Sequence, residues 1–232
     1  AAVTVLHEDD QILVVNKPSG LLAQPDHTGH PDVLTLAKER EETPDSFVGL
    51  VHRLDRPTSG IMVLARTSDA ARVLSRQFRE RTVQKEYLAV VEGTLRGAGT
   101  WRDYIAKPGR HPDIVGPDHP DGKPAALDWQ ALRRGDGRTL LRIQLRTGRP
   151  HQIRLQAAER GRPVAGDTRY GATGPGPSSG IALHHAILRV EHPSGARMET
   201  YVAPPPDGWA PLLTAEMEAV IEQALRQAHP GH

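Results

Sequence analysis

The spacing of hydrophobic residues predicts several β-strands. Residues 61–65 form an unbroken apolar run directly after Gly60, which is typical of a strand that is buried on both faces. In residues 138–146, leucine or isoleucine alternates with arginine or glutamine, so one face of this strand is expected to be buried and the other solvated. Strands are also predicted near the N-terminus, within residues 4–17, and over residues 85–93.

Helical spacing and helix-start signals predict four helices. Ala70, Leu74 and Phe78 recur at a spacing of four residues, and Ser68 stands before them as the expected N-cap. Pro150 is well placed to begin a helix that runs to residue 160, because proline fits the first turn of a helix. Two more helices are predicted, over residues 32–42 and 217–225.

The order of these elements indicates the fold class. Residues 97–123 are rich in glycine, proline and aspartate, and we expect mostly exposed loop there, with one short strand near residues 101–106. Strands outnumber helices and mostly follow each other through hairpins, so we expect an α+β fold with a large mixed, mainly antiparallel sheet and flanking helices. No repeat and no long linker divides the sequence, which predicts a single domain over residues 1–232.

The composition excludes several classes of chemistry. The 232-residue chain has no cysteine, so disulfides, thiolate zinc sites and cysteine nucleophiles are excluded. It has no apolar run near the ~20 residues that a membrane-spanning helix needs, and no signal-peptide pattern, so we expect a cytoplasmic protein without membrane contact. Only five of the 29 basic residues are lysines. The arginine excess suits phosphate and base contacts, but a GC-rich or heat-adapted source would also produce it.

A charged turn interrupts the apolar pattern between residues 49 and 65. His52, Arg53, Asp55 and Arg56 fall within five positions, whereas an ordinary turn needs only residues such as glycine, proline or asparagine. Nearby guanidiniums and backbone N–H groups would keep Asp55 ionised, as a nucleophile or a general base requires. The alternative is a structural aspartate that accepts hydrogen bonds from its own turn.

Two more polar positions are candidates for function. Arg149 and Arg154 lie where the alternating strand leads into a helix, and helix starts bind anions through their free N–H groups. Alternatively, Arg154 lies on the solvated face of a surface helix. Tyr87 lies in an otherwise apolar strand, where it is either a functional residue or a core tyrosine whose hydroxyl is satisfied.

Six stretches of sequence together resemble the RluA family of RNA pseudouridine synthases. They are NKPSGLL, HRLDRPTSGIMVLA, QFRERTVQKEYLAVVEG, RTGRPHQIRLQ, GDTRYG and LHHAILRVEHPSG, and they occur in the order that is typical of the family. The pairing of HRLDRPTSG with the distant GRPHQIR is specific. The resemblance implies the pseudouridine synthase catalytic fold. Because the pattern begins close to residue 1, we expect the compact form of the family, without an N-terminal RNA-binding domain of the S4 type.

The resemblance also implies a role for individual residues. The catalytic aspartate of the family falls on Asp55, its active-site tyrosine on Tyr87, and the basic residue that pairs with the aspartate on Arg154. Arg53 matches the arginine that fills the space left by a flipped base. The residues expected to contact RNA are Arg53, His52, Arg56, Lys17, Arg149 and Gln152.

The implied reaction is the isomerisation of a uridine in structured RNA, in a stem-loop of large-subunit rRNA, of tRNA or of both. Asp55 would either attack C1′ of the ribose or remove a ribose proton, and the sequence leaves both routes open. No cofactor and no metal ion are implied, because no atoms are gained or lost. We expect a monomer without an obligate protein partner.

Three other functions are compatible with parts of the sequence. A catalytically inactive RNA-binding module is one, because Arg72, Arg76 and Arg79 recur at helical spacing and would either follow phosphates or form a solvated face. A nucleoside hydrolase-like enzyme is another, but it would normally need a second carboxylate. A metal-dependent hydrolase has the least support, because adjacent histidines such as His184 and His185 point in different directions on a strand.

Overall fold

The computed structural model describes residues 3–43, 45–195 and 197–228. The two ends of the expected 1–232 domain, and residues 44 and 196 within it, lie outside the described residues. The chain divides into two compact units, and the expectation of a single domain stays a prediction. Unit 1 comprises Ala1–Lys85, His185–Pro206 and Ala224–His232, and unit 2 comprises Glu86–His184 and Asp207–Gln223.

Unit 1 is built on a β-sheet in which most strand pairs are antiparallel. In sheet order the strands are β1 (Thr4–Glu8), β2 (Ile12–Lys17), β4 (Ser59–Ala65) and β10 (Leu183–Glu191), with β3 (Gly49–Leu50) paired to β4 and β11 (Met198–Val202) paired to β10. The turn between β1 and β2 is closed by Asp9, whose Oδ1 accepts hydrogen bonds from the backbone N–H groups of Gln11 (2.8 Å) and Ile12 (2.9 Å). All seven residues of β4 are buried, as the apolar run predicts.

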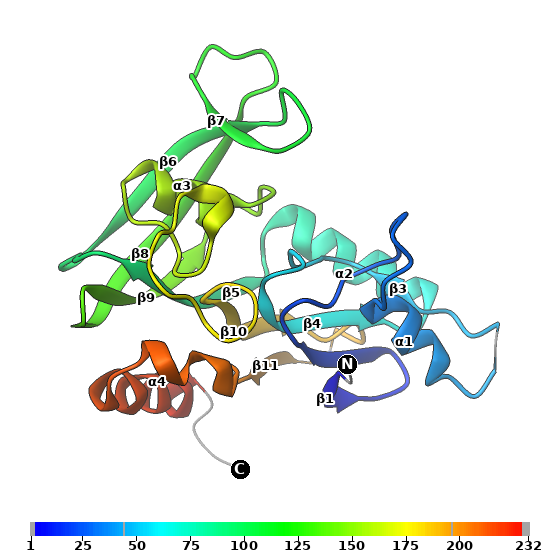
Figure 1. The fold of residues 1–232 in the computed structure, drawn as a ribbon. Coiled ribbons are helices and arrows are strands. Elements are labelled where there is room, and N and C mark those ends of the chain that lie inside the picture. The colour runs from blue at the N-terminus through cyan, green and yellow to red at the C-terminus, as the bar shows by residue number, and fades with distance from the viewer. Residues whose placement is uncertain (1–2, 44, 196, 229–232) are drawn as a thin grey trace. The chain divides into compact units, whose positions relative to one another are not determined.

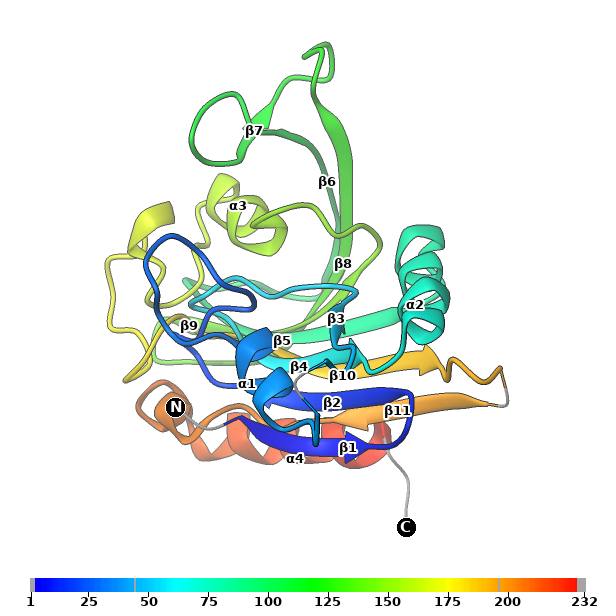
Figure 2. The same cartoon turned by 90° about the vertical axis from the view of Figure 1, so that its right-hand side faces the viewer.

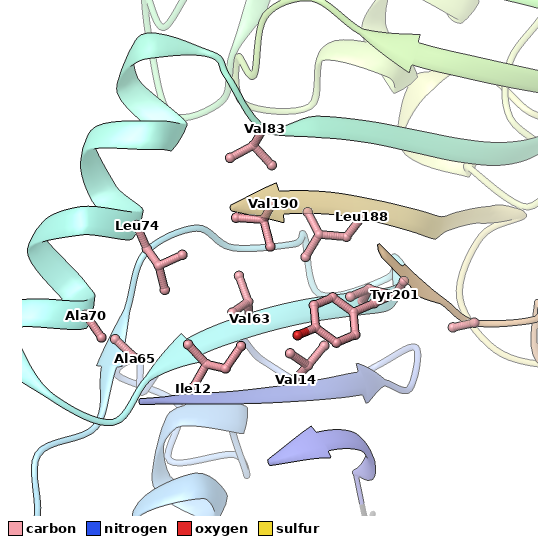
Figure 3. Packing of buried hydrophobic residues seen from close by; sticks show 12 residues of the cluster. Ile12, Val14, Val63, Ala65, Ala70, Leu74, Val83, Leu188, Val190 and Tyr201 are labelled. Carbon is pink, nitrogen blue, oxygen red and sulfur yellow. The ribbon is translucent and has the colours of Figure 1, made fainter. Parts of the chain in front are cut away.

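The core of unit 1 lies between this sheet and helix α2 (Ser68–Glu80) (Figure 3). Ala70 and Leu74 point from the helix toward the strands, where Val63 and Val190 meet them. Each fully buried valine or leucine side chain stabilises the fold by about 1.5–3 kcal/mol. The N-cap of α2 is Thr67, whose hydroxyl accepts a hydrogen bond from Ala70 N at 3.0 Å, so the prediction of Ser68 as the cap is wrong by one residue.

Unit 2 contains a second run of antiparallel strands. Their order is β5 (Gln84–Glu92), β9 (Arg138–Leu145), β8 (Lys123–Gly135), β6 (Ala98–Ala106) and β7 (Asp113–Val115). The strand predicted near residues 101–106 is confirmed, although β6 begins earlier, at Ala98, and the short strand β7 lies where only loop is predicted. Trp101 and Ile105 on β6 are buried at an even spacing, while glycine and aspartate stand between and beside them and hide the strand pattern.

Helix α3 (Gln152–Glu159) lies beside β6 and β7 in unit 2 (Figures 1 and 2). Its Leu155 is buried in one cluster with Ile105 of β6 and Ala125 of β8. A short 3₁₀ helix, η1 (Thr168–Tyr170), follows α3. The remaining helices are α1 (Val33–Glu39), η2 (Asp207–Leu212) and α4 (Ala215–Ala228).

The fold is of the α+β class and mainly antiparallel, as the sequence predicts. The alternation in β9 is confirmed, since Leu141 and Ile143 are buried while Gln144 is exposed. Among residues 3–43, 45–195 and 197–228, no helix has the length and apolar content that a membrane-spanning segment requires.

Candidate active site

Asp55 lies at the start of a tight turn that leads into β4. Its backbone carbonyl accepts a hydrogen bond from Thr58 N at 3.0 Å, which closes the turn. The neighbouring Leu54 is buried and anchors the turn, whereas Arg53 and Arg56 are exposed on either side of the partly exposed Asp55. The turn therefore holds one carboxylate between two guanidinium side chains at the surface of unit 1.

The loop after β2 supports this turn through hydrogen bonds. The buried Lys17 side chain donates from Nζ to the carbonyl oxygens of Pro18 (3.0 Å), Leu21 (2.8 Å) and Arg56 (3.2 Å). Burial lowers the pKa of Lys17 to about 7, opposed by the carboxylate of Asp55 and assisted by the charge of Arg56. The amine of Lys17 is thus enclosed and bound to backbone carbonyls, and RNA contact by Lys17 stays a prediction.

Three further hydrogen bonds join the same loop to the turn. Gly20 N donates to Arg56 O at 2.8 Å, Arg56 Nε donates to Gly20 O at 3.0 Å, and Ser19 Oγ donates to Pro57 O at 2.7 Å. Gly20 has a φ of +87°, a conformation that glycine adopts without strain. The NKPSG stretch therefore supports the charged turn through a set of hydrogen bonds.

His52 fixes the other side of the turn. Its Nε2 accepts a hydrogen bond from Val63 N at 3.0 Å, and its ring stacks on Phe78 of α2 with centroids 4.5 Å apart. An acceptor nitrogen carries no proton, so the imidazole is neutral. Burial holds the pKa of His52 well below its ordinary value, and the positive charges of His185 and Lys85 lower it further. RNA contact by His52 stays a prediction.

Gly60 allows β4 to pass very close to β10. It has a φ of +120°, and a Cβ atom there would lie 2.4 Å from the carbonyl oxygen of His185. The ring of His185 donates from Nδ1 to Ile61 O at 2.7 Å, so the two strands are also joined by a side chain. The strand that begins directly after the Asp55 turn is therefore held rigidly.

Unit 2 contains the second group of predicted residues, and Arg154 is its centre. Arg154 lies on α3 with its side chain buried, so the alternative of a position on the solvated face of a surface helix is wrong. Arg154 donates from Nε to Asp167 Oδ2 at 2.7 Å and from Nη2 to Asp167 Oδ1 at 2.9 Å. The ring of Tyr170 faces the guanidinium at 4.9 Å, and the Tyr170 hydroxyl is hydrogen-bonded to His151 Nδ1 at 2.6 Å.

Asp167 and Tyr170 were not recognised as candidates from the sequence. They lie in the GDTRYG stretch, which contributes to the family resemblance. The stretch combines an aspartate and a tyrosine with two glycines, which is a signal for a functional loop, but it does not show that these residues contact Arg154. The pairing with Arg154 becomes visible only when the chain after α3 returns to the helix.

Gln152 organises the start of α3 from inside. Its Oε1 accepts from Thr147 Oγ1 (2.7 Å) and Arg149 N (3.0 Å), and its Nε2 donates to Ala126 O and Gln156 Oε1, both at 3.0 Å. These bonds within the protein fix the loop that leads into α3. RNA contact by Gln152 stays a prediction.

The two other predicted residues of unit 2, Arg149 and Tyr87, lie outside α3. Arg149 is partly exposed and donates from Nε to Pro124 O at 3.0 Å, and its RNA contact stays a prediction. Tyr87 is buried in β5, where it pairs with Ile143 of β9.

Within the described residues, no group of three or more histidine, aspartate or glutamate side chains is arranged to hold a metal ion.

Comparison with known proteins identifies the family. The sequence model of the RNA pseudouridylate synthase family matches residues 11–159. The chain belongs to this family. The resemblance to RluA-type enzymes is thereby confirmed, and the matched range includes the Asp55 turn, Tyr87 and Arg154 but not Asp167.

Curated relatives and solved structures agree with this assignment. The chain is 36% identical to ribosomal large subunit pseudouridine synthase D of Nitrosomonas europaea, over 91% of this chain and 64% of that protein. It is 34% identical to the protein of the same name in Haemophilus influenzae, over 92% and 70% of the two chains. The chain therefore spans about two thirds of the length of these relatives. The structure of human RNA pseudouridylate synthase domain containing 1 superposes with a TM-score of 0.74 at 27% identity, over 97% of this chain and 95% of that one.

Proposed function

We propose that this chain is an RNA pseudouridine synthase that converts a specific uridine in structured RNA into pseudouridine. The observation that carries the proposal is the family match over residues 11–159, which includes both the Asp55 turn and the start of α3. The relatives are named for the large ribosomal subunit, and we infer that rRNA, tRNA or both supply the substrate of this chain as well.

Asp55 is the proposed catalytic residue. The bond between C1′ of the ribose and N1 of the uracil breaks, and a bond between C1′ and C5 forms. The proton on C5 is lost to a base and N1 gains one, so atoms balance without a cofactor. An ionised carboxylate serves this reaction as a nucleophile at C1′ or as a base for a ribose proton. Arg53 and Arg56 flank Asp55 in the turn, so its carboxylate lies between two positively charged residues in the sequence.

Arg154 and Tyr87 are the proposed partners of Asp55. Asp167 binds two of the five N–H groups of the Arg154 guanidinium and thereby fixes its orientation. From the resemblance to the family, we propose for Arg154 the role of the basic residue that holds the catalytic aspartate charged and correctly aimed. The aromatic ring of Tyr87 would stack on the uracil, or its hydroxyl would help the C5 proton to leave.

RNA binding is supported by exposed positive charge in both units. In unit 1, Arg53 lies exposed beside Asp55, and we propose that it fills the stack when the target uridine is flipped out. In unit 2, Lys107, Arg110 and His111 lie in the loop between β6 and β7, and Arg169 contacts His111 at 3.0 Å. Desolvation and the charges of Arg169, Arg110 and Lys107 lower the pKa of His111. Such clusters suit a phosphate backbone.

The test uses RNA that carries tritium at C5 of uracil. A pseudouridine synthase releases tritium to water and leaves the nucleoside in the chain, whereas a nucleoside hydrolase-like enzyme releases free uracil. An inactive RNA-binding module does neither. The Asp55→Asn variant keeps the shape of the side chain and is the control, and we expect it to fold, bind RNA and release no tritium. Tritium release by this variant at a rate near that of the wild type would overturn the assignment of Asp55.

A further inference from the structure

The solvent-facing side of α2 carries a row of arginines. Arg72, Arg76 and Arg79 are all exposed, and they stand at positions i, i+4 and i+7 of the helix. Residues at this spacing share one face, and a rise of about 1.5 Å per residue gives the row a length of about 10 Å. We call these three residues the α2 arginine row.

The opposite side of the helix is held firmly in unit 1. Ala70 and Leu74 are buried in the core (Figure 3). Gln77 donates from Nε2 to Glu191 O at 2.8 Å and accepts from Glu191 N at 3.0 Å, so its amide joins the helix to the end of β10. A helix fixed in this way presents its exposed side chains from a rigid base.

Interactions within α2 compensate only part of the positive charge of the α2 arginine row. Arg72 lies 3.5 Å from Asp69, although both side chains are largely exposed and such pairs contribute little. Arg79 lies in the last turn, where a positive charge interacts favourably with the helix dipole. Arg76 has neither compensation, and among the described residues it forms no ion pair. Like charges four residues apart destabilise a helix, so an anion from outside would offset this repulsion.

The α2 arginine row is coupled to the Asp55 turn through one aromatic contact. Phe78 lies between Gln77 and Arg79 on the helix and stacks on His52 at 4.5 Å. His52 stands three residues before Asp55 and is fixed by its hydrogen bond with Val63 N. A ligand held by the row would therefore have a defined position relative to Asp55 within the same unit.

We propose that the α2 arginine row binds the phosphate backbone of the substrate RNA beside the target uridine. The inference rests on the proposed function and adds an interaction surface to it. A backbone with regularly spaced phosphates matches a row of regularly spaced guanidiniums, because each planar fork binds phosphate through two parallel hydrogen bonds. Contacts to phosphate position the RNA but carry no sequence information.

The test compares two triple variants that remove the same charge. Arg72→Gln/Arg76→Gln/Arg79→Gln removes the row, and Arg96→Gln/Arg133→Gln/Arg134→Gln removes three exposed arginines of unit 2. Affinity for a stem-loop RNA is measured at several salt concentrations. Loss of the row should weaken binding on the order of tenfold and lower the salt slope by about 2, and the control variant should change both much less. The effect should fall on Kd rather than on the single-turnover rate at saturating RNA.

Three outcomes would overturn this proposal. The first is an equal loss of RNA affinity in both triple variants, which would indicate a general charge effect. The second is an unchanged salt slope in the variant that lacks the row. The third is a loss of affinity that is explained by a lowered melting temperature of that variant. The proposed function fails on a separate measurement, which is the absence of pseudouridine formation by the wild type. The binding comparison keeps its meaning in that case, because it does not depend on turnover.

Discussion

The carboxylate of Asp167 binds the guanidinium of Arg154 through two parallel hydrogen bonds, of 2.7 and 2.9 Å. Both side chains are at least 95% buried. Two charges that are buried together depend on each other, because removal of one leaves the other without compensation in a region of low dielectric. The orientation of the proposed catalytic arginine is thus fixed by a residue outside the matched family segment.

Asp167→Asn should therefore destabilise the protein strongly. The asparagine keeps the shape of the side chain but leaves the Arg154 charge unbalanced, and we expect a loss on the order of 3 kcal/mol in the free energy of unfolding, measured with urea. Asp103→Asn is the matched control, because Asp103 binds Gln156 and Arg160 of the same helix but lies closer to the surface. Equal stability of the Asp167 variant and the wild type would contradict the prediction.

Lys17 should make stability depend on pH above neutrality. Burial lowers its pKa from 10.5 to about 7 in the folded protein. Between pH 7 and 10 the unfolded chain therefore binds more protons than the folded chain, so stability rises as the pH rises. The expected contribution is about 2 kcal/mol between pH 7 and 9. Urea unfolding of the wild type and of Lys17→Met at both pH values measures it, and the same rise in both proteins would exclude Lys17 as its source.

Gly60 should tolerate no side chain. An added Cβ atom would lie 2.4 Å from His185 O at a φ of +120°, so Gly60→Ala forces β4 and β10 apart. We expect a loss of several kcal/mol, seen as a large drop in melting temperature. Gly97→Ala is the control, because Gly97 has a φ of +78° but nothing within 4 Å of an added Cβ. A similar small loss in both variants would show that β4 can move.

The sequence predicts those parts of the fold in which a single element determines the pattern. The apolar run of β4 and the alternation of β9 need no partner to be recognised, and both are confirmed. The burial of Lys17 could not be predicted, because one of its carbonyl partners, Arg56, lies 39 residues further along the chain. The ion pair of Asp167 with Arg154 could not be predicted either, because the two residues are 13 positions apart and Asp167 lies in a loop, which has no periodic pattern.

The charged turn, too, can be predicted from the sequence only in part. The sequence identifies Asp55 and its flanking arginines as candidates, because such residues are unusual in a turn. It does not show that Arg53 is exposed while its neighbour Leu54 is buried as an anchor. The structure thus gives Arg53 a fixed backbone and a side chain that solvent can reach.

Arg53→Ala should slow modification most when the target uridine is stacked in a folded loop. Extrusion of a stacked base costs a few kcal/mol, and a planar guanidinium in the vacated space recovers part of that cost. When the uridine is already bulged, little stacking is lost and the variant should approach the wild-type rate. Single-turnover rates of both proteins on a stacked and a bulged version of the same RNA test this. An equal loss on both RNAs, or a lowered melting temperature that accounts for the defect, would assign Arg53 to the structure of the turn instead.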